Sequence, residues 1–123
     1  MRGATRWAAS AGMFSSVMRW LARSLAARSQ RAPVGGWAAR YLPGEPGAYD
    51  YGVDYTRCAI RELALEVGAA DFAPYICLAD IIGSDELGWG LARTQTLAQG
   101  GTHCDFRFRR GQPTDVKRRL PVV

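Results

Sequence analysis

Several residue types that common catalytic and binding sites require are scarce in this 123-residue sequence. One histidine and no serine elbow leave no basis for a Ser-His-Asp triad, and no glycine run is followed by Lys-Ser or Lys-Thr, as a phosphate-binding loop requires. The three cysteines, at positions 58, 77 and 104, form no CxxC pair. This scatter excludes zinc-finger spacing and a secreted disulfide framework, and it predicts a protein of the reducing cytosol.

Long apolar runs are also missing. The best candidate, residues 8–27, is interrupted by Arg19 and Arg23, so we expect no membrane-spanning helix. The first 32 residues contain arginine and serine but no acid, a composition shared by mitochondrial transit peptides and ordinary amphipathic helices. One apolar stripe at helical spacing runs along this segment: Phe14, Val17, Met18, Leu21 and Leu25. We expect the stripe to pack on the domain or on a second copy rather than on a membrane surface, and a homodimer through this helix is the predicted assembly.

Charge is distributed unevenly along the chain, although the net charge is only +5. Residues 1–46 hold seven arginines and one acid, residues 47–105 hold nine acids and three arginines, and residues 106–123 hold six basic residues and one acid. A uniformly basic nucleic-acid binder would not have an acidic middle between two basic ends, so nucleic acid is not an expected partner. We expect the ordered fold and any site in the acidic middle.

Hydrophobic residues make up 48% of the chain and charged residues 22%, an ordinary globular balance. Spacing and turn signals predict, in order, a helix over 11–29, a helical turn over 37–42, a strand over 49–56, helices over 57–67 and 71–84, and strands over 88–97 and 102–109. The expected fold class is α+β: an N-terminal helix, then a small antiparallel sheet of about three strands packed with two helices, closing with a β-hairpin. We expect three regions, namely a basic helical leader with a Pro/Gly loop (1–46), the α+β core (47–110) and a loose basic tail (111–123).

Four side chains are candidates for chemistry. Cys77 and Asp80 are three residues apart and share one helix face, whereas Cys58 follows the first core strand and Cys104 lies on the last. If they converge, they form a thiolate–carboxylate cluster that holds a metal ion or supplies a nucleophile. The alternative is that the cysteines are small buried apolar residues. The sequence requires no cofactor; a divalent metal on the three thiols is the one it suggests.

Asp80 stands between two apolar runs, where an unpaired carboxylate is costly. It either pairs with an arginine (57, 61 or 93) or acts as an acid–base group with a raised pKa. On the last strand, adjacent residues point to opposite faces. His103 and Cys104 therefore enter one pocket only across a bulge.

Three segments of the core carry motifs that occur together. Residues 51–59 (YGVDYTRCA) form an aromatic strand that ends in Arg-Cys, and residues 72–80 (FAPYICLAD) contain P-x-x-C-x-x-D. Residues 91–107 (LARTQTLAQGGTHCDFR) contain R-T-x-T-L-A-x-G-G-x-x-C-D-F, which reads as a hairpin. In this order, the segments resemble the L-2-amino-thiazoline-4-carboxylic acid hydrolase family, over about residues 49–109.

The resemblance implies an enzyme, a hydrolase that opens a cyclic amidine to an N-carbamoyl amino acid. Water adds to the carbon between the ring nitrogen and the sulfur, and the carbon–sulfur bond breaks to give N-carbamoyl-cysteine. Such chemistry needs a group that activates water, an acid for the leaving thiolate and a cation for the substrate carboxylate. On the matching motif positions, the catalytic candidates are Asp80, as general base, with Cys58, Cys77 and Cys104.

The substrate-binding candidates on these motifs are Arg93, as the clamp for the carboxylate, with His103 and Asp105. The family also resembles α+β ligand-binding domains of the 4-vinyl-reductase type. The alternative function is therefore a non-catalytic small-molecule-binding or sensor domain, and either function implies a small-molecule partner.

Overall fold

The protein, seen in a computed structural model, is described over residues 3–117. Its helices are α1 (Gly3–Met13), α2 (Ser16–Arg31), α3 (Ala59–Glu66), α4 (Ala73–Ile76) and α5 (Leu78–Leu87), with short 3₁₀ helices η1 (Ala70–Phe72) and η2 (Leu97–Gln99). Its strands are β1 (Ala38–Leu42), β2 (Tyr51–Arg57), β3 (Ala92–Arg93), β4 (Cys104–Phe108) and β5 (Asp115–Val116). Among the residues in this range, no helix is both long enough and apolar enough to cross a membrane.

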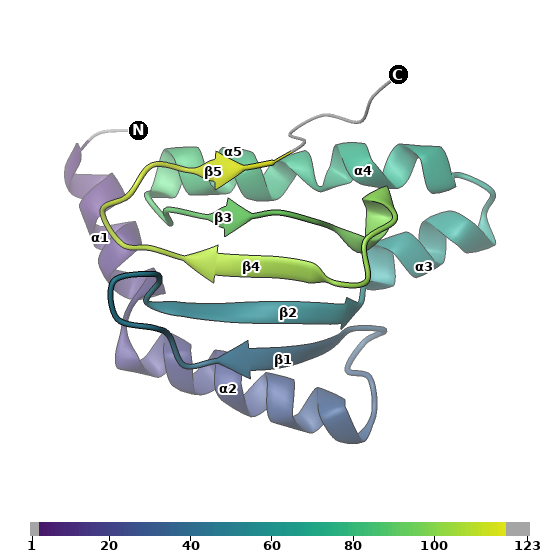
Figure 1. Ribbon diagram of the computed structural model, residues 1–123, viewed down its shortest axis with the longest axis horizontal. Coiled ribbons are helices and arrows are strands. Elements are labelled where there is room, and N and C mark those ends of the chain that lie inside the picture. The colour runs from purple at the N-terminus through teal and green to yellow at the C-terminus, as the bar shows by residue number, and fades with distance from the viewer. Residues whose placement is uncertain (1–2, 118–123) are drawn as a thin grey trace.

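One five-stranded sheet, ordered β1-β2-β4-β3-β5, carries the fold. All its pairings are antiparallel except that of β3 with β5. The helices pack on one face, with α2 along β1 at one edge and α5 along β3 and β5 at the other (Figure 1). The α+β class with an N-terminal helix is confirmed, with five strands in place of about three.

Strand β1 corrects the prediction of a helical turn over 37–42. An alanine-rich stretch fits either state, and tertiary contacts decide it. The Ala39 amide donates to Ser29 Oγ of α2 at 2.9 Å, and Tyr41 stands opposite Val53 of β2. Part of the expected leader therefore belongs to the same sheet as the core.

Strand β5 lies within the segment expected to be a loose tail. The Asp115 amide donates to the Leu91 carbonyl at 2.8 Å, the Lys117 amide donates to the Arg93 carbonyl at 2.9 Å, and Val116 is buried. Backbone pairing with a strand distant in the sequence orders these residues, and their local sequence pattern does not predict this strand. Residues 118–123 of the expected tail lie outside the described range.

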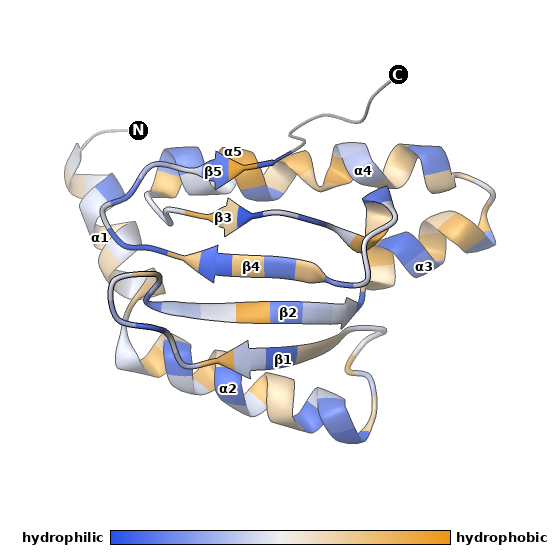
Figure 2. Cartoon of the chain, viewed as in Figure 1, coloured by the Kyte–Doolittle hydropathy of each residue, from blue (hydrophilic) through white to orange (hydrophobic). Residues whose placement is uncertain are grey.

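The single N-terminal helix predicted over 11–29 is two helices. Ser15 caps the second by accepting a hydrogen bond from the Met18 amide at 3.2 Å. Helix α2 turns small residues such as Ala26 and Ser29 toward the sheet, and apolar positions remain on its outer surface (Figure 2). Of the predicted stripe, Phe14 packs in the core, and the exposed members are Val17, Met18, Leu21 and Leu25. Within the single chain only Phe14 of the stripe packs fully on the domain, and packing of the exposed members on a second copy stays a prediction.

The alternation predicted for β2 sets the two faces of the sheet. Tyr51 pairs with Phe108 and Tyr55 with Cys104, so these side chains share the helix-covered face. Tyr51 is 1% exposed, and its hydroxyl donates to the Met13 carbonyl at 2.9 Å, which ties the first helix to the core. Val53 and Phe106 lie on the same face, whereas Asp54 and Arg107 point to the opposite face. That face is turned to the viewer in Figure 1.

The predicted pairing of the last two core strands is confirmed, since Ala92 pairs antiparallel with Arg107. Strand β3 is only two residues long because the chain bends away after it and forms η2. Gly90, just before β3, has φ +60°, and a Cβ there would lie 1.9 Å from the Arg109 carbonyl oxygen. Only glycine allows this close approach of the two strands.

Candidate active site

The three cysteines, Asp80 and Arg93 line one cavity of about 140 Å³, which we call the thiol cavity. Its remaining walls are mainly apolar or aromatic and include Trp37, Tyr55, Ile60, Ala73, Ile76, Thr96 and Phe106. The side chains that the sequence suggested could converge therefore do so in the folded chain. Trp37, Thr96 and Phe106 were not among the candidates, because only long-range folding brings them to the site.

Helices α4 and α5 set two of these groups one turn apart. Cys77 lies at the junction of the two helices, and its thiol donates to the Ala73 carbonyl at 3.7 Å. Asp80 follows in the first turn of α5. Cys58 precedes α3 at its N-cap position, while Arg93 and Cys104 come from β3 and β4.

Arg93 is the arginine that pairs with Asp80, with 3.4 Å between Nη1 and Oδ2. Its side chain is 3% exposed, and its Nη2 reaches the Cys77 carbonyl only at 3.5 Å. Its Nε is buried and has no hydrogen-bond partner. A buried guanidinium with one unsatisfied N–H and two long contacts is a ready site for a further acceptor, such as a carboxylate.

Burial governs the titration of the groups in this cavity. It raises the pKa of Asp80 above its usual range, although Arg93 opposes the shift. It raises the pKa of Cys104 to about 11, against the Leu97 amide that donates to the sulfur at 3.2 Å. The pKa of Cys77 is also raised by burial, again with Arg93 opposing. Cys77 and Cys104 are therefore neutral thiols at pH 7, which weakens the prediction that they act as thiolates.

The same fact bears on the metal hypothesis. Metal ligation by cysteine requires the thiolate. Within residues 3–117, no group of three or more His, Cys, Asp or Glu side chains is placed to hold a metal ion. The thiol cavity does not fit a metal on Cys58, Cys77 and Cys104.

His103 and Asp105 do not border the thiol cavity, although both were candidates for substrate binding. His103 immediately precedes β4 and Asp105 lies on it, and both side chains point to the opposite face of the sheet from Cys104. Asp105 accepts hydrogen bonds from the amides of Thr94 and Gln95, both at 2.9 Å. Asp105 therefore shapes the turn after β3 rather than reaching a ligand in this cavity.

The opposite face of the sheet holds a second carboxylate that sequence reasoning did not select. Asp54 is 3% exposed and accepts hydrogen bonds from Arg107 at 2.7 Å and Arg40 at 3.0 Å. Burial alone would raise its pKa, but these two hydrogen bonds outweigh burial and hold the pKa below the usual range. The arginines come from neighbouring strands, and Gly52 leaves room for Arg107, since a Cβ there would lie 2.8 Å from Arg107 Cδ.

Comparison with known proteins supports the motif resemblance. A family model described as L-2-amino-thiazoline-4-carboxylic acid hydrolase matches residues 3–108. The chain belongs to this family. The match covers the motif segments of the core and also α1 and α2, and it places the chain in an enzyme family. No curated protein and no solved structure matches it.

Proposed function

We propose that the thiol cavity is the active site of a hydrolase that opens a 2-amino-thiazoline-4-carboxylate-like cyclic amidine to an N-carbamoyl amino acid. The observation that carries the proposal is the meeting of Asp80 and the unsatisfied Arg93 in one small cavity. Its volume of about 140 Å³ is close to that of engineered cavities that hold one benzene molecule. A five-membered ring is of similar size.

Arg93 binds the substrate carboxylate through its free Nε–H, which fixes the ring beside Asp80. The ionised Asp80 accepts a proton from water as the oxygen attacks the ring carbon between nitrogen and sulfur. The carbon–sulfur bond then breaks. The water oxygen becomes the urea carbonyl, and the two water hydrogens finish on the former ring nitrogen and on the sulfur.

Asp80 suits both proton transfers because its raised pKa brings it closer to neutrality than an ordinary aspartate. It takes the first proton as a base and returns it to the leaving sulfur as an acid. The neutral Cys77 and Cys104 thiols line the cavity and limit access of bulk water. Cys58 is the remaining candidate for a direct role.

Three variants test this assignment with 2-amino-thiazoline-4-carboxylate as substrate and release of the free thiol as the measurement. We expect Asp80→Asn to lower kcat by about 10²–10⁴ and Cys77→Ser to retain turnover within about tenfold. Cys58→Ser separates a direct role, which would lower kcat strongly, from a lining role. Full turnover in all three variants would remove these residues from the mechanism.

The second candidate function is a non-catalytic small-molecule-binding domain. The observation that favours it is the mainly apolar lining of the cavity together with protonated thiols. Tight binding of a carboxylic acid without turnover of any thiazoline would select it. A cytosolic location and a homodimer through α2 stay predictions; sedimentation of the purified chain tests the dimer.

A further inference from the structure

Two further cavities adjoin the thiol cavity, so the available space is larger than a five-membered ring needs. A second cavity of about 260 Å³, here the aromatic cavity, shares four lining residues with it: Trp37, Tyr55, Asp80 and Phe106. A third cavity of about 340 Å³, here the α2 cavity, again borders Trp37 and Tyr55. The three cavities therefore adjoin one another at this aromatic pair, and we call them together the trough.

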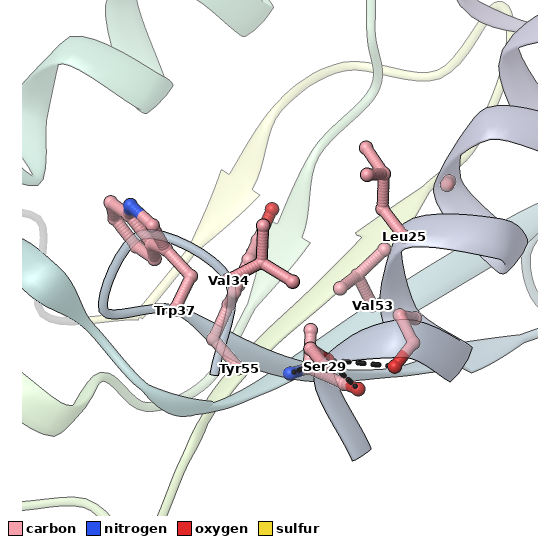
Figure 3. A pocket seen from close by; sticks show the side chains of 9 residues that line it. Leu25, Ser29, Val34, Trp37, Val53 and Tyr55 are labelled. Carbon is pink, nitrogen blue, oxygen red and sulfur yellow. Dashed lines mark hydrogen bonds between the residues drawn. The ribbon is translucent and has the colours of Figure 1, made fainter. Parts of the chain in front are cut away.

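The architecture explains why the trough exists. Helix α2 covers β1 through small side chains, and α5 covers the other edge of the sheet, so the helix side of β2 and β4 lies between them (Figure 1). The floor of the trough is Val53, Tyr55 and Phe106. Figure 3 shows Leu25 of α2, Val34 and Trp37 around the same space as Val53.

The charged groups of the trough lie at one end, and the other end is mainly apolar. Among residues 3–117, the polar groups that border the α2 cavity are those of Ser29, Trp37 and Tyr55, and the Ser29 hydroxyl already donates to the carbonyls of Ala26 and Ala39. Asp80 is the one charged residue that borders the aromatic cavity. Two cations, Arg61 and Arg93, border the thiol cavity, and Arg93 has a buried N–H without a partner. A ligand that satisfies all three cavities has an anionic head and an apolar body longer than one ring.

We propose that the substrate is a carboxylic acid that carries an apolar extension, with its carboxylate on Arg93 and its extension along the trough toward Leu25. This inference rests on the proposed function for the orientation of the head and names the class of substrate more narrowly. The unsubstituted thiazoline carboxylate fills the thiol cavity alone.

The test is calorimetric titration of the purified chain with straight-chain carboxylates from butanoate to dodecanoate, with octan-1-ol as the neutral probe. Affinity should rise roughly fourfold per added methylene, which is the gain expected for a buried CH₂. Arg93→Gln should weaken octanoate binding at least tenfold and leave octanol binding unchanged. Affinity that does not depend on chain length would overturn the inference.

Surface variants keep the test informative if Arg93→Gln does not fold. Leu25 borders the α2 cavity, whereas Val17 lies on the same helix, is 68% exposed and borders none of the three cavities. Leu25→Ser should weaken dodecanoate binding severalfold and leave butanoate binding unchanged, and Val17→Ser should affect neither. Equal effects of the two variants would contradict the inference. A second outcome would also contradict the inference: the chain binds none of the acids, and Leu25→Ser dissociates a dimer. A second copy of the chain would then occupy the trough.

The inference and the proposed function fail in different ways. Length-dependent binding without hydrolysis of any thiazoline would overturn the proposed function and leave the inference standing. Hydrolysis of the unsubstituted thiazoline with kcat/KM that does not rise for a ring-alkylated derivative would overturn the inference and leave the function standing.

Discussion

Two aspartates on opposite faces of one sheet are tuned in opposite directions. Asp54 is held by Arg107 at 2.7 Å and Arg40 at 3.0 Å, its side chain is 4% exposed, and its pKa lies below the usual range. Asp80 has one long contact to Arg93 at 3.4 Å, its 44% exposed side chain borders the cavities, and burial raises its pKa. The difference lies in the number and length of the hydrogen bonds rather than in residue type. Asp54 is a structural clamp, and Asp80 retains unused hydrogen-bonding capacity for chemistry.

The largest expected effect comes from removing the chemistry on the helix side. Asp80→Asn should lower kcat for ring opening by about 10²–10⁴, the usual contribution of a positioned general base. The measurement is initial-rate kinetics beside Asp115→Asn, whose carboxylate is exposed and does not border the thiol cavity. A rate within threefold of the wild type would show that Asp80 is not the base.

The next largest effect comes from the clamp on the other face. Asp54→Asn should lower the free energy of unfolding by about 1–3 kcal/mol, because it removes the buried acceptor of two charged hydrogen bonds, whereas the Arg40 and Arg107 side chains, 66% and 25% exposed, remain in contact with water. Urea denaturation measures the loss, with Asp115→Asn again as the control, since exposed pairs contribute less than about 1 kcal/mol. If both variants lost the same small amount, Asp54 would be no more than a surface charge.

Lowering the pH should reduce activity, which depends on Asp80, before it reduces the stability to which Asp54 contributes. The proposed mechanism uses the ionised form of Asp80, so activity should fall as pH drops through its raised pKa, above the ordinary 3.8. Protonating Asp80 favours the folded state, because its folded pKa is the higher one. The stability that Asp54 contributes is present above its unfolded pKa and is lost only as pH falls through its lowered pKa. We therefore expect a pH window with a folded, inactive chain, detected by circular dichroism beside activity; simultaneous loss of both would contradict it.

The smallest effect concerns His103. Its Nε2 lies 3.8 Å from Asp54 Oδ1, and it does not border the thiol cavity. His103→Gln should change KM less than twofold and stability by about 1 kcal/mol or less. A large rise in KM would restore the substrate-binding role that the motif suggested for this residue.

The sequence was sufficient to predict features that depend on the spacing of residues along a single strand or helix. Alternation along the last strand correctly required His103 to point away from Cys104. Helical spacing correctly set Cys77 beside Asp80.

What the sequence could not predict depends on partners far along the chain. The sequence of β1 predicts a helical turn, but a hydrogen bond to Ser29 and pairing with β2 hold the segment extended. Strand β5 forms through backbone hydrogen bonds to residues 91–93. The local sequence indicates an exposed position for Asp54, but Arg40 and Arg107 donate hydrogen bonds to it and cover it. Likewise, no local signal shows that Arg93, rather than Arg57 or Arg61, is the partner of Asp80.

The most direct measurement is the pKa of both carboxyl groups, by carbon-13 NMR of the aspartate side chains between pH 2 and 8. Asp80→Asn and Asp54→Asn assign the two signals. The expected result is that the Asp80 carboxyl titrates above 3.8 and the Asp54 carboxyl below it. An Asp80 carboxyl that titrates at or below Asp54 would contradict the assignment of Asp80 as the poised base and Asp54 as the clamp.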